Sequence, residues 1–521
     1  MDRLEGVSSG ELPAMLQRLD DARSRRHNEV GDSAHMAISL AYQCLPATPV
    51  CLAAHLSSSS SAAASSPGDG ADRLSSLPDE VLRNVVSRLP AKDAARTGAL
   101  ASRWRGVWRS VPLVLVDSHL LGVVSSTQRI TVADDDDAAS RAVVDAASRA
   151  LAAHPGPFRC VRLTWSHMAS HQREMARWMQ LLAAKGVQEL DLINRPWPLD
   201  LPLPAALFKC ASLTRLHLGV WRFPDTAALP RAATAAFPHL RELFLTMVLM
   251  TEQDLTFLLS CSPALEILTI ISSRFSVRLR LVSKSLRCLQ LVMCSLEDIV
   301  VEDAPCLERL ILVGAHGRRI GGKRCARIKI GNAPKLCMLG HWRPVDLQLG
   351  IGSVVIEAGT KVSPSTIAPS IKILSFEMQF ESIIVNEPTG KVNLKFWQEA
   401  GTVECVQQHV KKLVFHDFQG KKSEIAFLKF IAEKAQMLEM MVIMLCPGCF
   451  SLENDVNAKL RPLTTAKWAC KNFKLIVLKS PVCEEGSRPW SFRMACDFSC
   501  RDPFDLVTAK LRRGASVFHH P

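Results

Sequence analysis

The sequence predicts an α/β protein in which a short three-helix segment is followed by a solenoid of repeated strands. Two observations lead to this expectation. Apolar residues recur at helical spacing between Leu77 and Trp108, and a leucine pattern returns at near-regular intervals from Cys160 onward. The chain of 521 residues is long for one hydrophobic core, so two or more structural units are expected.

The segment from Leu77 to Trp108 is expected to form three short helices. Pro78 suits a first helical turn, and Asp79 follows where the helix dipole favours negative charge. The first helix carries an apolar stripe at spacings of three and four residues, formed by Leu82, Val85, Val86 and Leu89. Two further helices are expected over 91–100 and 102–108. Helices this short cannot hide all their apolar side chains among themselves, so some must face a neighbouring domain or a partner.

A repeated template, L-x-x-L-x-L, follows this segment. Its copies, including weaker ones at both ends, begin at Cys160, Val187, Leu213, Leu240, Leu265, Leu286, Leu307 and Leu336, with gaps of 21 to 29 residues. That period is typical of leucine-rich repeats, in which strands stack into a curved solenoid. The Asn or Cys that usually follows each strand is missing except at Cys294, so an irregular member of the class is expected.

Alternation along each repeat strand predicts which side chains face outward on the concave sheet. This face begins charged and becomes apolar along the chain. The candidate target-binding residues are Arg215, His217, Glu242, Phe244, Ile267, Ile271 and Arg309. The alternative is that a C-terminal element covers them, because irregular solenoids often bury one face.

The stretch from Asp72 to Pro112 resembles an F-box of the plant type. It has the opening Leu-Pro, a second Leu-Pro, a Lys-Asp pair, then "SRWR" and a closing Trp. In that family the three helices dock on a Skp-type adaptor, which is bound to a cullin scaffold in a ubiquitin ligase. The resemblance implies these adaptor-binding residues: Leu77, Pro78, Leu82, Val85, Leu89, Pro90, Leu100, Trp104 and Trp108. The alternative is that the stripe is simply core for the following domain.

The run from Val410 to Ile443 resembles the FBD domain that follows the F-box and leucine-rich repeats in many plant proteins. The resemblances together imply an α/β chain with a three-helix F-box, an irregular leucine-rich-repeat solenoid and a C-terminal α/β FBD extension. The expected organisation is a weakly ordered arm over 1–71, the F-box over 72–113, linker helices over 114–157, the repeats over 158–380, the FBD domain over 381–455, and an extension over 456–521 that could continue the solenoid.

Charge and cysteine content narrow the function classes. The formal charge of +13 permits nucleic-acid binding, but the basic residues are scattered, so nucleic acid is an unlikely partner. No stretch reaches about 18 consecutive apolar residues, so no membrane association is expected. The first residues lack the apolar run of a secretory signal, so the cytoplasm or nucleus is the expected compartment. The 17 cysteines are therefore expected to be reduced.

The sharpest chemical motif is "CPGC", from Cys446 to Cys449, which has the spacing of a thiol pair or half a zinc site. It follows an expected strand and contains Pro-Gly, so a turn is the favoured interpretation. No catalytic triad, paired carboxylates or phosphate loop is found, and no metal or cofactor is expected.

The favoured function is a non-catalytic substrate-recognition subunit of a Skp-cullin-F-box ubiquitin ligase. The F-box would bind the adaptor and hence a cullin-RING ligase, while the repeats would bind an unknown target protein. Two alternatives remain open at this point: a leucine-rich-repeat interaction scaffold outside any ligase, and a basic nucleic-acid-binding protein.

Overall fold

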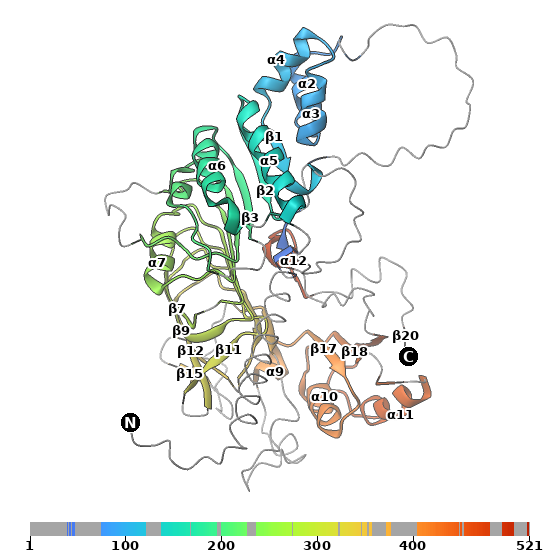
Figure 1. Cartoon of the computed structure of the whole chain (residues 1–521). Helices are drawn as coiled ribbons and strands as arrows, with labels where there is room; N and C mark the ends of the chain where they lie inside the picture. The colour runs from blue at the N-terminus through green and yellow to red at the C-terminus, as the bar shows by residue number, and fades with distance from the viewer. Residues whose placement is uncertain are drawn as a thin grey trace, which may run out of the picture. The chain divides into compact units, whose positions relative to one another are not determined.

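The computed structural model forms two compact units, Met1–Leu336 and Cys337–Pro521 (Figure 1). It describes single residues between 39 and 50, residue 74, and the ranges 76–120, 137–166, 168–194, 200–226, 236–273, 275–320, 323–344, 346–351, 354–356, 371–376, 404–446, 449–450, 453–479, 492–504 and 518–519.

Three short helices open the first unit, as the sequence predicts: α2 (Asp79–Val86), α3 (Ala91–Thr97) and α4 (Ser102–Ser110). Prolines stand immediately before α2 and α3, where a missing N–H leaves no helical hydrogen bond unmade. Asp79 begins α2 and forms an ion pair with Arg103 of α4, with the nearest N and O atoms 2.7 Å apart. The two helices are therefore tied together at this end.

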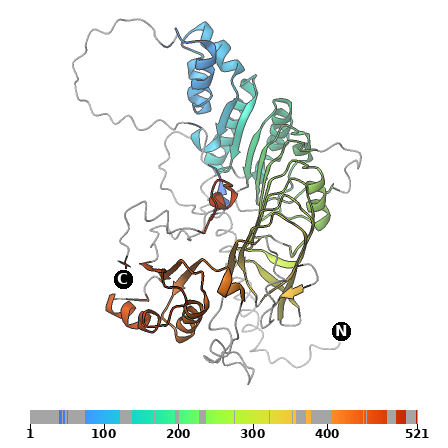
Figure 2. The same ribbon diagram turned by 180° about the vertical axis from the view of Figure 1, so that it is seen from behind.

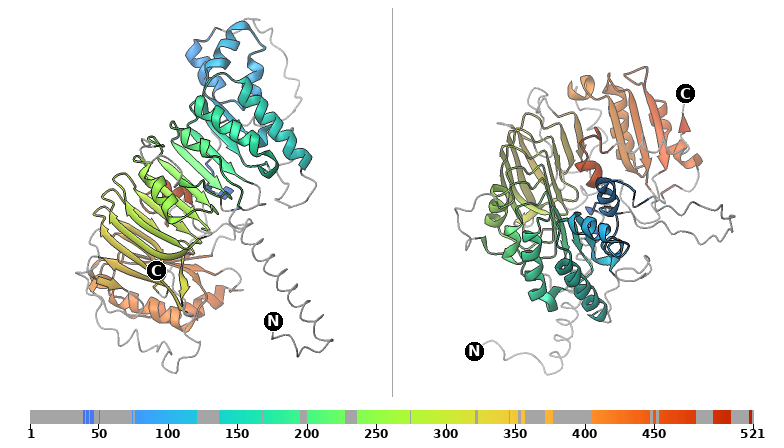
Figure 3. Two further views of the ribbon diagram at one scale, coloured as in Figure 1. Left: turned by 60° about the vertical axis from the view of Figure 1, so that its left-hand side comes forward. Right: turned by 90° about the horizontal axis from the view of Figure 1, so that it is seen from above.

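A parallel sheet forms the body of the first unit. Its strands, in spatial order, are β1 (Leu113–Val116), β2 (Phe158–Leu163), β3 (Glu189–Ile193), β4 (Arg215–Gly219), β5 (Glu242–Thr246), β6 (Ile267–Ile271), β8 (Cys288–Val292) and β10 (Arg309–Ile311). Each repeat adds one strand beside the preceding one, which Figure 3 shows from two further directions. The predicted solenoid is confirmed, and it starts one strand earlier, at β1, inside the range expected to hold linker helices.

The chain leaves β4, β5, β6 and β8 through one residue in the left-handed region. These residues are Val220, Met247, Ser272 and Met293, with φ between 49° and 63°. Each donates its N–H to a carbonyl at or just beyond the end of the next strand, over 2.7 to 2.9 Å. A left-handed conformation costs a non-glycine residue roughly 1–2 kcal/mol, and this second ladder of hydrogen bonds offsets that cost. The turns therefore continue the hydrogen-bond ladder of the sheet beyond the strand ends.

The convex side of the repeats changes character along the chain. The earlier repeats have helices and short 3-10 turns on this side: α5 (Asp137–Ala153), α6 (Gln172–Ala184) and α7 (Glu252–Ser260). Later repeats use strands β7 (Val277–Val282), β9 (Ser295–Asp303), β11 (His316–Ile320) and β12 (Lys323–Asn332), which form a second sheet (Figures 1 and 2). An extended strand rises about 3.3 Å per residue and a helix 1.5 Å. Extended arms therefore explain why these repeats recur after only 21 residues.

The described strands of the second unit fall into three groups. β13 (Met338–Trp342) pairs with β16 (Ile373–Phe376), and β14 (Leu347–Ile351) pairs separately with β15 (Val354–Ile356). The third group is a four-stranded sheet in the order β17 (Lys412–Phe418), β18 (Met440–Leu445), β19 (Lys474–Lys479) and β20 (Phe518–His519). Its parallel strands alternate with α10 (Lys422–Lys434) and α11 (Glu453–Thr464), and α9 (Glu404–Gln408) and α12 (Phe492–Cys496) complete the described helices.

The core of this four-stranded sheet lies against α10 and α11. Phe427, Leu428 and Ile431 of α10 pack on Met441 and Ile443 of β18. A helix and a strand thus occupy the run that resembles an FBD domain. The extension over 456–521, which could have continued the solenoid, instead contributes β19, which pairs with β18 and so belongs to this sheet.

The left-handed turns predict the effect of adding a glycine. Ser272→Gly should stabilise the chain by about 1 kcal/mol, because glycine adopts φ of 49° without steric cost. Thr256→Gly, in the middle of α7, should destabilise it by a similar amount. Urea unfolding monitored by circular dichroism measures both, and a loss of stability in Ser272→Gly would contradict the account of the turns.

Candidate functional site

The three-helix segment has a small internal core and an apolar exterior. Its buried side chains are Leu82, Val86, Ala94, Trp104 and Val107. Four large apolar side chains are exposed: Leu74 at 60%, Val81 at 43%, Val85 at 42% and Leu100 at 69%. Exposure of this extent on so small a unit indicates a surface that a partner covers.

The residues expected to contact an adaptor fall into three groups. Pro78, Val85 and Leu100 are exposed, and Leu77, Leu89, Pro90 and Trp108 are half-buried. Leu82 and Trp104 are buried among the helices, which differs from their expected role as contacts: they hold the helices that present the others. Leu74 and Val81 lie on the exposed surface and were not singled out from the sequence, because a helical stripe does not say which edge of it stays outside.

Trp108 joins the helices to the first strands instead of extending the exposed surface. Its ring packs edge-on against His154, with centroids 5.2 Å apart, and His154 packs in the same way on Phe158 of β2. The His154 Nε2 atom lies 3.1 Å from the Val111 carbonyl oxygen, just after α4. Burial lowers the pKa of His154, so the ring is held neutral at this junction. These aromatic contacts fix the helices on the end of the sheet.

The second candidate surface is the concave side of the sheet, where alternate residues of each strand align in rows. One row runs through Arg162, Asp191, His217, Phe244, Thr269 and Gln290. The neighbouring row runs through Cys160, Glu189, Arg215, Glu242, Ile267 and Cys288. The predicted alternation is therefore right in register. The first row begins with the charged pair Arg162 and Asp191, and in the second row the charged residues Glu189 and Arg215 follow Cys160.

Arg162, Asp191 and His217 lie side by side at the start of the first row. Arg162 donates Nε–H to Asp191 Oδ2 over 2.8 Å, and His217 Nδ1 lies 3.7 Å from Asp191 Oδ1. The Asp191 side chain has no exposed surface, so its charge requires this arginine. Burial lowers the pKa of His217 to about 4, although the Asp191 carboxylate opposes that shift. The imidazole is therefore neutral at physiological pH.

The second row carries a parallel pair of charges. Glu189 forms an ion pair with Arg215, the residue that faces it on the next strand. Glu242 follows on β5, and burial raises the pKa of its carboxyl group although Arg215 opposes the shift. Opposite charges on facing strands stabilise the sheet and leave few charges unpaired on this surface.

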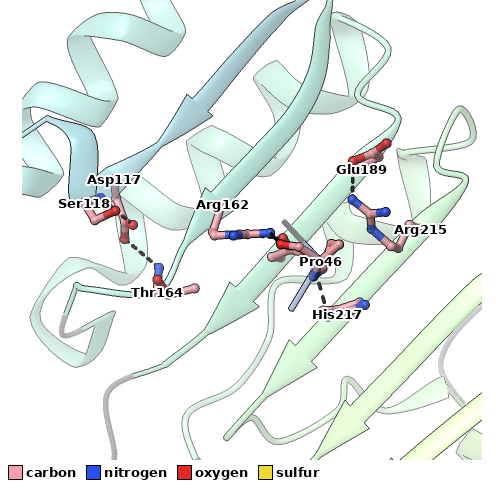
Figure 4. Close-up of polar contacts among 9 residues, drawn as sticks. Pro46, Asp117, Ser118, Arg162, Thr164, Glu189, Arg215 and His217 are labelled. Atoms are coloured by element: carbon pink, nitrogen blue, oxygen red, sulfur yellow. Dashed lines mark hydrogen bonds and ion pairs between the residues drawn. The ribbon is translucent and has the colours of Figure 1, made fainter. Parts of the chain in front are cut away.

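The expected target-binding residues are less accessible than the sequence analysis assumed. Arg215 and Glu242 are half-buried, whereas His217, Phe244, Ile267, Ile271 and Arg309 are buried. The residues share the concave face, as predicted, but they do not form an open contact surface. The expected alternative of a covered face therefore describes this region better. Over the first strands the cover comes from the N-terminal side: Arg162 Nη2 donates to the carbonyl oxygen of Pro46 over 3.0 Å (Figure 4).

Arg162 and Asp191 are the central residues of this surface, and neither was among the expected target contacts. Asp191 was visible as an alternating residue of its strand, but Arg162 lies in the weak first copy of the repeat, where the leucine signal is poor. Asp117 was not foreseen: it is buried and accepts the backbone N–H groups of Thr164 and Trp165 over 2.5 and 2.7 Å. An aspartate that anchors a distant backbone has no local sequence pattern.

Thiol and metal chemistry find little support. Cys446 and Cys449 lie at a turn, with the Cys449 N–H 3.4 Å from the Cys446 carbonyl oxygen. Burial first, and the neighbouring Cys449 second, raise the pKa of Cys446 to about 11, which disfavours the reactive thiolate. Across the described ranges, no three or more His, Cys, Asp or Glu side chains gather as a metal site would need. In the same ranges no helix has the length and apolarity to cross a membrane.

Comparison with protein families matches three regions of the chain. An F-box domain model matches residues 74–115, the leucine-rich-repeat model of "FBD-associated F-box protein At5g56370" matches residues 175–385, and an FBD model matches residues 398–443. The expected F-box, repeats and FBD domain are thereby confirmed.

Individual relatives come from Arabidopsis thaliana. "F-box/FBD/LRR-repeat protein At1g13570" is 28% identical over 203 residues, 39% of this chain and 45% of the relative. "Putative F-box/FBD/LRR-repeat protein At4g00315" is 30% identical over 255 residues, 46% of this chain and 52% of the relative. The chain thus matches about half the length of these relatives.

The helices, the repeat sheet and these matches define the chain as an F-box protein with leucine-rich repeats. An FBD match follows the repeats, so the chain carries the three domain types that the names of these Arabidopsis relatives print.

The buried histidine predicts a pH dependence. An unfolded histidine titrates near 6.5, and His217 in the folded chain near 4, so its neutral state contributes stability that is complete above pH 6.5. That stability is lost as the pH falls towards 4. Urea midpoints should therefore fall between pH 7 and pH 5, with a shallower fall in His217→Asn than in the exposed control His239→Asn. Equal slopes in the two variants would contradict the assignment.

Proposed function

We propose that the chain is the substrate-recognition subunit of a Skp-cullin-F-box ubiquitin ligase. The F-box match over residues 74–115, together with the exposed apolar side chains of Val81, Val85 and Leu100, is the observation that carries this proposal. A Skp-type adaptor would cover these side chains, and through it the chain would join a cullin-RING ligase. The cytoplasm or the nucleus is the compartment that suits this role.

The chain's contribution in this proposal is positional. The F-box holds the adaptor, and the leucine-rich repeats hold a target protein, so that ubiquitin transfer by the ligase becomes effectively intramolecular. The contacts of Trp108 with His154 support this division, because they fix the F-box helices on the repeat sheet and limit the positions a bound target can take. No residue of this chain is assigned a role as a catalytic acid, base or nucleophile.

Charged substitutions on the exposed F-box surface test the adaptor contact. The double change Val85→Asp with Leu100→Asp should weaken binding to a plant Skp-type adaptor at least tenfold, because it places two carboxylates in an apolar interface. The matched control is Val355→Asp in β15, since Val355 is also an exposed valine, at 54%. Isothermal titration calorimetry measures both affinities.

Circular dichroism establishes that the double variant stays folded, as expected for exposed positions. Unchanged adaptor affinity in a folded double variant would show that these side chains are not the docking surface. The chain would then be better described as a repeat protein acting outside a ligase.

A further inference from the structure

A short N-terminal segment of the chain lies on the concave surface of the repeat sheet. Its described residues lie between Ala41 and Val50, more than sixty positions before the strands they contact. The arm over 1–71 was expected to be weakly ordered, whereas these described residues of it are packed. The segment makes both polar and apolar contacts with the sheet, as a bound peptide does.

Polar contacts tie the segment to β2 and to the residue that follows it. Tyr42 donates its hydroxyl to the backbone carbonyl of Thr164, which follows β2, over 2.7 Å. Arg162 donates to the Pro46 carbonyl through Nη2 while its Nε–H remains on Asp191. A single guanidinium thus bridges the buried carboxylate and the segment's backbone, a use that suits its fixed fork of donors.

Apolar side chains seat the segment on both sides of that bridge. Ala41 and Leu45 pack on Ile193, and both are buried. At the other end Val50 packs on Val114 and Cys160 in the first two strands. Cys44, between these anchors, is 5% exposed. Such alternation of side-chain anchors with a backbone hydrogen bond is how peptides are held on protein surfaces.

Two polar atoms beside this seat are not satisfied by the segment. Asp191 Oδ1 and His217 Nε2 are buried and have no hydrogen-bond partner among the described residues. The His217 ring is neutral, and with its proton on Nδ1 facing Asp191, its Nε2 is an acceptor. An N–H or O–H donor at this point would therefore gain contacts that the resident segment does not make.

We propose that the concave surface over β1 to β4 is a peptide-docking surface whose resident occupant is the segment between Ala41 and Val50. A target peptide displaces this segment. It presents a backbone carbonyl to Arg162, an apolar side chain to Ile193, and a hydroxyl or amide donor to His217. The identification of the displacing peptide with a ligase target rests on the proposed function, whereas the docking of the segment does not.

Because the segment is covalently part of the chain, a target peptide must exceed a minimum affinity to displace it. A linked segment competes at a high effective concentration, so a free peptide of equal intrinsic affinity cannot displace it efficiently. A target with the additional donor for His217 has the advantage that displacement requires. The segment therefore selects against weak apolar peptides.

Thiol accessibility in the full chain tests whether the segment is docked. Cys44 should be alkylated by iodoacetamide at least tenfold more slowly than the exposed Cys449, with mass spectrometry of fragment ions assigning each site. Leu45→Asp, which places a carboxylate against Ile193, should bring the Cys44 rate to that of Cys449. Equal rates at the two cysteines in the unchanged chain would overturn the docking.

A peptide added in trans tests the surface itself. The probe is a fluorescein-labelled peptide with the sequence of residues 40–50, LAYQCLPATPV, and fluorescence anisotropy measures its binding. The full-length Leu45→Asp chain should bind it saturably and at least tenfold more tightly than the unchanged chain. The same peptide carrying the Leu45→Asp change should not bind. Absence of binding to the Leu45→Asp chain, or equal binding to both chains, would overturn the proposal.

Neither measurement contains adaptor or ligase. Failure here would leave adaptor docking by the F-box unaffected, and failure of adaptor docking would leave the peptide surface in place. The two proposals are therefore tested separately.

Discussion

The first unit depends on one backbone constraint: every parallel strand must satisfy its N–H and C=O groups with the strands on either side. The register keeps Leu216, Leu243 and Leu268 aligned on neighbouring strands, and the left-handed turns continue the ladder beyond the strand ends. Each repeat strand is hydrogen-bonded to the strand of the next repeat. The convex arm can therefore change from a helix to a strand without disturbing the sheet. The concave rows inherit their alignment from the same ladder.

The concave rows show what this alignment makes possible. Asp191 is buried and has Arg162 and His217 on the strands to either side, which only the parallel register provides. A buried carboxylate without its partner would destabilise the fold, so Arg162 is required for structure and for holding the Pro46 carbonyl. The F-box helices pack beside the first strands and contribute a second surface, made of exposed apolar side chains. The first unit therefore has two surfaces of different chemistry.

Sequence patterns predicted much of this structure, namely the F-box helices and the repeat strands, because local spacing determines them. Burial was predicted less well. The helical stripe does not distinguish Leu82, which is buried, from Val85, which is exposed. The covering of Arg162 by Pro46 joins residues 116 positions apart, and pairing of β19 with β18 is likewise non-local. Such contacts depend on the assembled fold, so periodicity cannot reveal them.

If a Skp-type adaptor docks on the F-box helices, as proposed, it leaves the repeat sheet unchanged. Hydrogen–deuterium exchange of the full chain, with and without a plant Skp-type adaptor, measures this directly. Peptides from residues 74–110 should exchange more slowly with adaptor present, and exchange in β2 to β6 should be unchanged. Protection centred on the repeat strands, or no protection in residues 74–110 at saturating adaptor, would contradict it.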